Sequence, residues 1–403
     1  MKKLLVLLIT LSVFLFTACA KQDENKTILK FSSWGSRTEY GILKQVISDY
    51  EKLHPEVKIE FIHVPENYFR KLHLLFAAKS APDVVFVNNT YAPLYIKADL
   101  LEDLSNLVDE KEYFPSALNC FKYNNKLYAV PRDISNLVIY VNKNYVKNPE
   151  NIKTIYDLRR VAKKTTNRGI YGFNYEKQPL FWLYFLEYFN GGILSENGEK
   201  VILDTHESIQ GLQFYADMIN KDKSVPQEWQ MAGMTSAQMF INGKIAMYLS
   251  GRWLVPKFRE TIKFDWDVIP FPQSETSKTL TDASGWAISK TSKNKELAYD
   301  FIKYLASKET SLLFAKTGLI TPARKDTANS LEFLAPDLKP HNSKAFINSV
   351  KNSKPTPVNE NYAQIIDEVT KNITPTLNGK ITAQKAMNEP FIKKLQKYCS
   401  KKQ

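Results

Sequence analysis

The sequence predicts an α/β fold, in which strands and helices alternate along a chain long enough for two domains. The chain has 403 residues, of which 44% are hydrophobic and 24% are charged, an ordinary balance for a soluble globular protein. This balance excludes an intrinsically disordered chain, a collagen-like fibre and a small scaffold held by disulfides. Aromatic residues make up 12%, and a surplus of this kind is typical of ligand-binding grooves.

The first elements follow a β-α-β-α-β order. Apolar residues alternate or recur at helical spacing in five segments, which are a strand at 28–33, a helix at 40–53, a strand at 57–61, a helix at 69–79 and a strand at 84–87. This order implies a parallel sheet with right-handed crossovers. Ligands bind at the carboxyl ends of strands in such sheets, which here are residues 34–37 and 88–91.

A second set of elements follows residue 131. Residues 181–189 are nearly all apolar or aromatic, and Gly191-Gly192 ends that run. There is no internal repeat, low-complexity run or long linker. The expected elements are a strand at 137–142, a helix at 157–164 after a Thr154 cap, a short strand at 169–173, a helix at 207–220, and a segment 236–242 that leads to a strand at 246–249.

The chain is basic, with a net charge of +13 from 55 Lys and Arg against 42 Asp and Glu. Such a balance is compatible with nucleic acid, an anionic membrane surface or general solubility. The basic residues are scattered, and we interpret the one dense cluster, at 393–402, as a solvated helix face and tail. Because no nucleic-acid-binding module accompanies the charge, we predict no nucleic-acid partner.

The N-terminus predicts export. Lys2 and Lys3 precede an apolar run at 4–16, which has the length of a signal-peptide core. The run ends in Thr17-Ala18-Cys19, which resembles the lipobox of bacterial lipoproteins, in which the cysteine carries the lipid. Phe16 stands where that family usually has Leu, so cleavage by the ordinary signal peptidase stays open. We expect a signal peptide at 1–18, a lipidated tether at 19–26, and a protein anchored to the cell membrane that faces the periplasm or the exterior.

Two further cysteines, Cys120 and Cys399, have two interpretations. They pair in an oxidising compartment, or Cys120 is a core thiol and Cys399 lies in a frayed tail. The second is favoured, because one bridge to a terminal tail is not needed for stability.

Motifs of catalysis and cofactor binding are missing from the sequence. There is no phosphate-binding Gly-Lys-Ser/Thr loop, no dinucleotide fingerprint and no nucleophile elbow. The five histidines lack metal-ligand spacing. We therefore predict no cofactor, no metal and no enzyme activity. Counting carboxylates leaves a glycosidase pair open, and the acidic candidates Asp133 and Asp282 equally suit acceptance of hydrogen bonds from a sugar hydroxyl.

An ordered series of segments carries a family resemblance over nearly the whole chain after the leader. They include Ala81-Pro82-Asp83-Val84-Val85 and Ser250-Gly251-Arg252-Trp253, together with residues 125–131, 138–143, 154–158, 190–192, 239–247, 266–270, 285–289, 298–305 and 318–323. The series resembles the extracellular solute-binding proteins of ABC importers, in the group that mostly carries sugars and includes the maltose-binding type.

The resemblance implies a periplasmic-binding-protein-like fold of two α/β lobes that close around a ligand at a hinge. It places the chain crossings near 133–137, 277–282 and 326–336. The N-lobe is then 27–134 plus 283–328, and the C-lobe is 138–278 plus 335–403. The implied partners are a sugar and the membrane subunits of an ABC permease, with a cytoplasmic ATPase behind them. We expect a monomer.

Sugars present flat apolar faces edged with hydroxyl groups, so their sites combine aromatic platforms with planar hydrogen-bonding groups. The position of Trp253 is a recurrent stacking position in the family. Trp182 has a second interpretation as a core residue, because apolar residues surround it. The candidates are Trp34, Trp182, Trp253 and Trp286, the last preceded by Gly285.

Polar candidates lie in the same loops. Asn89 and Tyr91 stand where the maltose-binding relatives use a charged pair, which argues against maltose itself. Each arginine suits vicinal hydroxyls or an anionic group and equally suits a surface ion pair. The polar candidates are Ser36, Arg37, Asn89, Tyr91, Arg132, Asp133 and Arg324.

Two alternatives to a sugar-binding protein follow from the same residues. Arg37, Arg132, Arg252 and Arg324, with the basic net charge, suit glycerol 3-phosphate or another anionic solute. A surface lipoprotein that degrades glycans is the alternative from a different class.

Overall fold

The computed structural model describes residues 26–176 and 179–399. The predicted signal peptide, the lipidation residue Cys19 and most of the tether lie outside this part of the chain. Two sheets organise the described residues, one of seven strands and one of four, beside a two-stranded hairpin of β4 (Lys122–Tyr123) and β5 (Lys126–Leu127). No helix in the described ranges is both long and apolar enough to cross a bilayer.

The seven-stranded sheet contains the predicted parallel core. Strand β1 pairs in parallel with both β2 and β3, which confirms the sheet expected from the first five elements. The order is β12-β6-β11-β3-β1-β2, with β13 beside β11. The strands are β1 (Thr27–Ser33), β2 (Val57–His63), β3 (Val84–Asn88), β6 (Val130–Ser135), β11 (Thr279–Ile288), β12 (Thr321–Pro322) and β13 (Ser353–Pro355).

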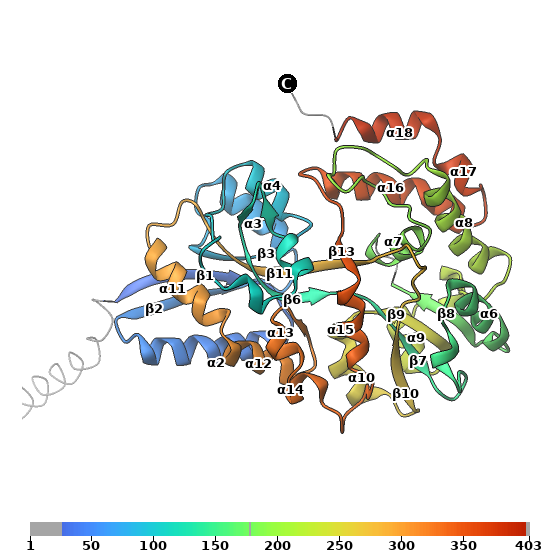
Figure 1. Ribbon diagram of the computed structural model, residues 1–403, viewed down its shortest axis with the longest axis horizontal. Helices are drawn as coiled ribbons and strands as arrows, with labels where there is room; N and C mark the ends of the chain where they lie inside the picture. The colour runs from blue at the N-terminus through green and yellow to red at the C-terminus, as the bar shows by residue number, and fades with distance from the viewer. Residues whose placement is uncertain (1–25, 177–178, 400–403) are drawn as a thin grey trace, which may run out of the picture.

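Helices cover both faces of this sheet, with α2 and α12 on one side and α3 and α4 on the other (Figure 1). The two predicted helices are present as α2 and α3. The helices of this half are α2 (Arg37–Leu53), α3 (Tyr68–Ala77), α4 (Ala92–Lys97), α5 (Pro115–Asn119), α11 (Lys295–Leu305), α12 (Lys308–Lys316), α13 (Lys325–Ala328) and α14 (Leu331–Leu334), with a short 3₁₀ turn η1 (Glu110–Glu112).

The four-stranded sheet has the order β10-β7-β9-β8, and only β8 and β9 run parallel. Alternate residues of β7 enter two different cores, Tyr140 on one face and Val141 on the other, as the period of two in a strand requires. The strands are β7 (Val138–Asn142), β8 (Tyr171–Tyr175), β9 (Ile245–Ser250) and β10 (Trp266–Pro270).

Helices surround the smaller sheet as well. The apolar run at 181–189 lies mostly within helix α7, and the predicted helices at 157–164 and 207–220 are present as α6 and α8. The elements are α6 (Ile155–Thr165), α7 (Pro179–Tyr188), α8 (His206–Asn220), α9 (Ser236–Ile241), α10 (Val255–Thr261), α15 (Lys344–Lys351), α16 (Tyr362–Leu377), α17 (Ala383–Ala386), α18 (Glu389–Gln396) and the 3₁₀ turns η2 (Pro149–Asn151), η3 (Glu228–Met231) and η4 (Arg252–Leu254).

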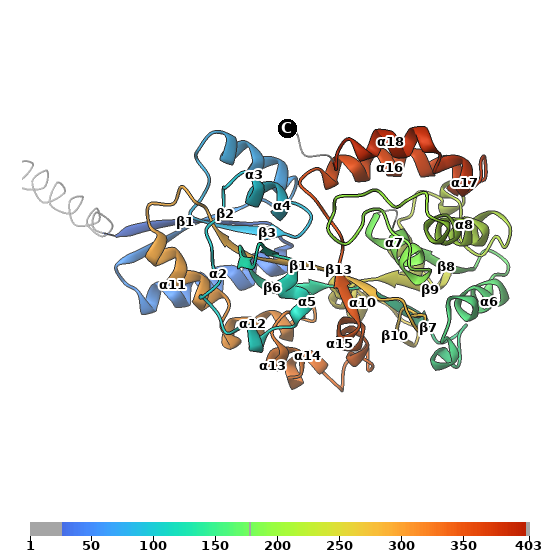
Figure 2. The same cartoon turned by 45° about the horizontal axis from the view of Figure 1, so that its top comes forward.

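The two halves lie side by side, with β6, β11 and β13 between them (Figure 2). The chain passes from the large sheet to the small one between β6 and β7, and it returns between β10 and β11. The first residues of β11 pair with β13 and its later residues pair with β6 and β3, so β11 runs from the middle of the molecule into the large sheet. We propose that each sheet is the centre of one lobe, with the N-lobe and C-lobe boundaries given above; β13 and the first residues of β11, which extend the large sheet, then lie outside the N-lobe at the junction of the two.

Candidate ligand-binding site

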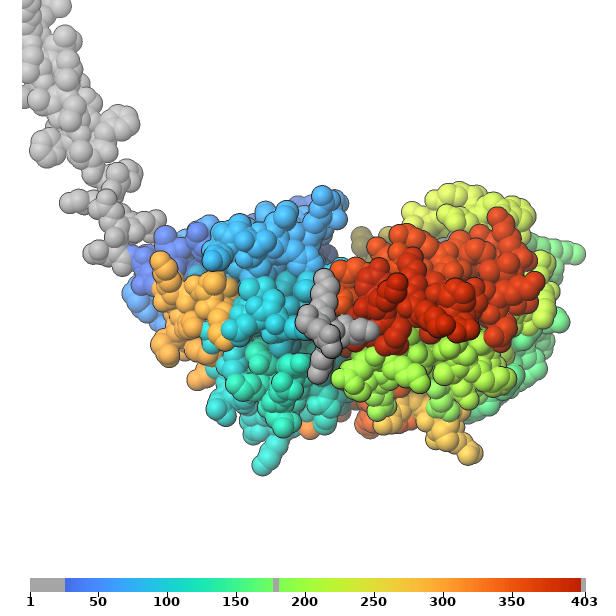
Figure 3. Space-filling model, turned by 90° about the horizontal axis from the view of Figure 1, so that it is seen from above, coloured from blue at the N-terminus to red at the C-terminus, as the bar shows by residue number. Residues whose placement is uncertain are grey.

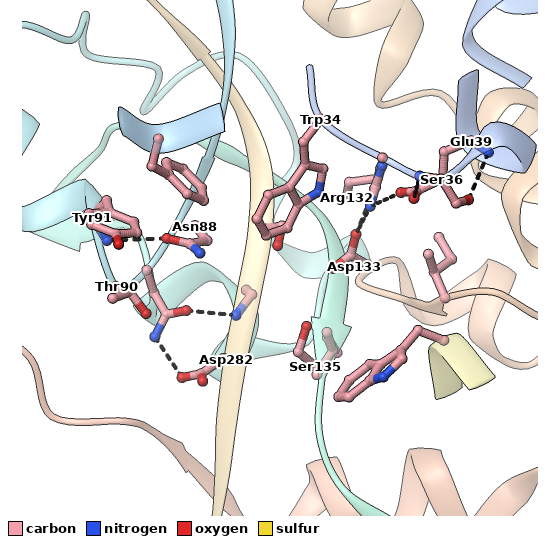
Figure 4. Close-up of a pocket in the computed structure, with 18 of the residues that line it drawn as sticks. Trp34, Ser36, Glu39, Asn88, Thr90, Tyr91, Arg132, Asp133, Ser135 and Asp282 are labelled. Carbon is pink, nitrogen blue, oxygen red and sulfur yellow. Dashed lines mark hydrogen bonds and ion pairs between the residues drawn. The ribbon is translucent and has the colours of Figure 1, made fainter. Parts of the chain in front are cut away.

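A cavity of about 1400 Å³ lies between the two sheets. Its N-lobe wall includes the loops after β1, β2 and β3 together with residues of α2, α3, β6 and β11. Its C-lobe wall includes Leu183 on α7, Arg252 and Trp253 after β9, and the first turns of α16. Both strand ends predicted to bind ligand, residues 34–37 and 88–91, therefore line one cavity (Figure 4).

The loop after β1 is shaped by Gly35, whose φ of +137° is rarely adopted by other residues. A Cβ atom at this position would lie 2.8 Å from Cβ of Glu39. Ser36 caps α2: its Oγ accepts a hydrogen bond from the Glu39 amide at 3.3 Å, and its amide donates to Glu39 Oε2 at 2.8 Å. The cap directs the Glu39 carboxylate back toward the cavity, while Arg37 is exposed beside it.

Arg132 lies between two carboxylates below this loop. Its Nε donates to Asp133 Oδ2 at 2.6 Å, and its Nη2 lies 3.0 Å from Glu39 Oε1. All three side chains are buried, and the guanidinium carbon stacks 4.5 Å from the Phe86 ring centroid. Burial raises the pKa of the Asp133 carboxyl, while the charge of Arg132 opposes that rise. The result is a buried cluster of two carboxylates around one guanidinium (Figure 4).

Asn89 ties the end of β3 to β11. Its Nδ2 donates to Asp282 Oδ1 at 2.7 Å, and its Oδ1 accepts from the Ala283 amide at 3.1 Å. Asn89 is 1% exposed. Its side-chain amide therefore links β3 to β11, and Asp282 provides the carboxylate that faces the cavity. Burial raises the pKa of Asp282 despite the hydrogen bond that it accepts from Asn89.

Aromatic rings form the apolar part of the N-lobe wall. The Trp34 and Phe69 rings pack edge to face at 5.1 Å between centroids, and the Tyr91 ring stacks on Phe69 at 4.4 Å. Burial raises the pKa of the Tyr91 hydroxyl, and the charge of Asp367 on α16 adds to that rise. Tyr91 of one lobe therefore lies within electrostatic reach of the other lobe.

Trp253 supplies an aromatic surface from the C-lobe. Its side chain is 38% exposed and lines the cavity. The ring lies back over Gly251, where an added Cβ would be 1.8 Å from Cζ3 of the indole. The Tyr140 hydroxyl donates to the Gly251 carbonyl at 2.8 Å, which fixes the backbone beneath the ring.

A family model of bacterial extracellular solute-binding proteins matches residues 34–311. The chain belongs to this family. The galactooligosaccharide-binding protein of Bacillus subtilis is 21% identical over 373 residues, which cover 88% of this chain and 86% of the relative. The maltooligosaccharide ABC transporter solute-binding lipoprotein of Streptococcus pneumoniae is 27% identical over 286 residues, 66% of this chain and 64% of the relative.

A solved structure supports the fold of this solute-binding protein. The ABC substrate-binding protein from Listeria monocytogenes in complex with cycloalternan matches with a TM-score of 0.81 at 23% identity, covering 93% of this chain and 98% of that one. The predicted two-lobe periplasmic-binding-protein-like fold is confirmed.

Four residues that we predicted to bind ligand lie outside the cavity of this solute-binding protein. Trp286 is fully buried in the N-lobe core between Phe31 and Phe86, and Trp182 is buried in the C-lobe core on α7. Both rings were placed by their neighbours in sequence, which do not reveal the face to which a side chain points.

Gly285 and Arg324 take part in strand packing and in ion pairs, respectively, and do not line the cavity. A Cβ on Gly285 would lie 2.3 Å from the Val130 carbonyl oxygen, so this glycine permits close packing of β11 on β6. Arg324 forms ion pairs at 2.9 Å with Glu112 and with Asp326.

The structure also brings residues to the cavity that the sequence analysis did not select. Glu39, His63 and Asp367 line it. Glu39 had a readable signal, because Ser36 followed three residues later by Glu is the pattern of a capping box. Asp367 had none, because only the packing of α16 brings it to the cleft.

Within residues 26–176 and 179–399, the thiols and carboxylates form neither a metal site nor a disulfide. The described part of the chain contains no group of three His, Cys, Asp or Glu that could hold a metal ion. Cys120 is a buried free thiol that donates to the Thr281 carbonyl at 3.5 Å, and Cys399 is a free thiol 3.5 Å from Asn359 Nδ2.

Proposed function

We propose that this solute-binding protein captures a carbohydrate between its lobes and delivers it to the membrane subunits of an ABC importer. The observation that carries the proposal is the pairing of Trp34 and Trp253 on opposite walls of one cavity whose polar lining is rich in carboxylates. Such a cavity suits a ligand with flat apolar faces and hydroxyl edges. The relatives named for galactooligosaccharides and maltooligosaccharides support the same ligand class.

The charges of the lining favour a neutral polyhydroxylated ligand over an anion. Among the described residues that line the cavity, the carboxylates are Glu39, Glu66, Asp133, Asp282 and Asp367, and the guanidiniums are Arg37, Arg132 and Arg252. Arg132 is already paired with two carboxylates, so little of its charge is available to a ligand. A phosphate would meet a net negative lining, whereas sugar hydroxyls donate hydrogen bonds to carboxylates.

Delivery requires no catalytic step. A ligand that contacts both lobes binds the closed state better than the open one, and its binding therefore shifts the population toward closure. The residues that we propose to contact it are Trp34, Ser36, Arg37, Tyr91, Asp133, Asp282 and Trp253, with Asn89 and Arg132 holding the acidic groups in place.

We propose further that Cys19 carries a lipid that anchors this extracellular protein to the membrane. Conversion of Cys19 to Ser should release the chain from the membrane fraction into the medium or periplasm and abolish incorporation of labelled palmitate. A Cys19→Ser chain that stays membrane-bound would contradict the anchor without bearing on ligand binding.

The decisive experiment uses the soluble form that starts at Lys21. Intrinsic tryptophan fluorescence and the melting temperature are followed during titration with mono- and oligosaccharides, with glycerol 3-phosphate alongside. A sugar that binds the folded state raises the melting temperature by mass action, and Trp253→Ala should abolish the response.

Other outcomes identify the alternatives. A response to glycerol 3-phosphate alone would replace the sugar with an anionic solute. Release of smaller sugars from an oligosaccharide during incubation would replace binding with hydrolysis.

A further inference from the structure

Trp229 is 80% exposed, which is unusual for a side chain that is on average among the most buried in globular proteins. It lies on the 3₁₀ turn η3 and is not among the residues that line the cavity. Packing in the core therefore does not account for a tryptophan at this position, and its ring is accessible to a ligand.

The backbone places this turn at the carboxyl end of β8. The Phe173 amide donates to the Ser224 carbonyl at 3.1 Å, so the chain enters beside β8. The Ser236 hydroxyl donates to the Tyr175 carbonyl at 2.9 Å, so the chain leaves at the last residue of β8. The intervening residues 227–235, with Trp229 among them, therefore form a loop at this edge of the C-lobe sheet.

The neighbouring strand delivers Trp253 to the same edge. Strands β8 and β9 run parallel, with Tyr175 paired to Leu249, so their carboxyl ends lie together. Trp253 follows β9 by three residues and lines the cavity. Seen from above, yellow-green residues of the C-lobe lie across the notch between the lobes from light blue residues of the N-lobe (Figure 3).

Side-chain hydrogen bonds and packing hold the turn that carries Trp229. The Gln227 amide donates to Gln230 Oε1 at 2.8 Å, which caps the turn, and Gln227 Nε2 donates to Asn220 Oδ1 at the end of α8 at 3.0 Å. Met231 and Met234 pack against the hydrophobic core on the following residues. A ring presented on such a support loses little conformational entropy when it binds a ligand.

We infer that Trp229 is a second aromatic platform of the C-lobe, which stacks on sugar units of an oligosaccharide that extends beyond the cavity. The inference rests on the proposed function and specifies its substrate class, which is an oligosaccharide longer than the cavity alone can hold. Because Trp229 lies outside the cavity lining while Trp253 lies within it, loss of each ring has a different dependence on ligand length.

The test measures affinity against chain length by titration calorimetry on the soluble form that starts at Lys21. The probes are maltose to maltoheptaose and galactooligosaccharides of two to six units. Trp229→Ala should weaken the longer bound probes about tenfold and leave the shortest bound probe unchanged, and Trp229→Phe should retain most of the affinity. Trp253→Ala should weaken all lengths.

Tyr156→Ala is the matched control, because Tyr156 is an exposed C-lobe aromatic, 56% exposed, at the start of α6. It should bind every probe as the wild type does. Equal affinities of Trp229→Ala and the wild type for all lengths would overturn this inference alone, as would an equal loss at every length. A wild type that binds none of the carbohydrates would overturn the proposed function instead.

Discussion

Gly251 offers a way to displace the Trp253 ring without altering the ring. A Cβ added at Gly251 would lie 1.8 Å from Cζ3, 2.3 Å from Cη2 and 2.4 Å from Cε3 of the indole. Non-bonded carbons need about 3.5–4.0 Å, so the ring must move by about 2 Å. The backbone itself accepts alanine, because Gly251 has an extended conformation with φ −95° and ψ 179°.

Gly251→Ala should therefore weaken sugar binding while leaving the fold intact. A platform displaced by this amount loses its stacking contact, and we expect an affinity about tenfold lower, which is about 1.4 kcal/mol. The ring is 38% exposed, so the free energy of unfolding should change by less than about 1 kcal/mol. Titration calorimetry with the tightest sugar and urea unfolding measure the two quantities.

A double-mutant cycle decides whether the loss acts through the ring. Once Trp253 is alanine, Gly251→Ala has no ring to displace, so the double variant should bind no worse than Trp253→Ala alone. Gly41→Ala on α2 is the matched control, because a Cβ there meets no atom within 4 Å. Wild-type affinity in Gly251→Ala, or additive losses in the double variant, would refute the assigned position of the ring.

Three further predictions concern the polar groups and the thiols. Burial raises the pKa of Asp282. Ionisation of this carboxyl therefore lowers the free energy of unfolding, and the loss develops as the pH rises through the folded-state pKa. Asp282→Asn should then be more stable than the wild type by on the order of 1 kcal/mol at pH 7 in urea unfolding, lose that advantage at low pH, and bind sugar more weakly; equal curves at both pH values would contradict this. Glu39→Gln removes one of the two carboxylates of Arg132 and should destabilise the fold by about 1–3 kcal/mol, and an unchanged unfolding midpoint would contradict it. Cys120 and Cys399 are free thiols, so two thiols should titrate in the unfolded soluble form without reductant, and none if they pair.

The parts of the fold that were predictable from sequence are those with local causes. Alternation and helical spacing indicated β1 to β3 and the helices between them, and a parallel sheet followed from their order. The antiparallel insertion of β11 between β3 and β6 was not predicted, because it pairs residues more than 140 positions apart and has no local signature.

The candidate site shows the same division. Trp34 and Trp253 follow strand ends and line the cavity. The position of a residue that comes shortly after a strand is fixed by the end of that strand, so it could be predicted from the sequence. Trp286 lies within β11 and is buried, because alternate residues of a central strand face its two covered sides. A glycine before a tryptophan therefore carried no information about exposure.

The polar groups of the N-lobe wall are already hydrogen-bonded or ion-paired to one another. In the N-lobe, Glu39, Arg132 and Asp133 hold one another, and Asn89 holds Asp282, so these acceptors are oriented before a ligand arrives. Such preorganisation lowers the cost of binding. Both lobes add aromatic surface, Trp34 and Tyr91 from the N-lobe and Trp253 from the C-lobe, and we propose that a ligand seated on the N-lobe contacts Trp253 when the lobes approach. We expect a solute that satisfies the acidic groups but presents no flat face to Trp253 to gain little from closure, so that closure itself favours sugars.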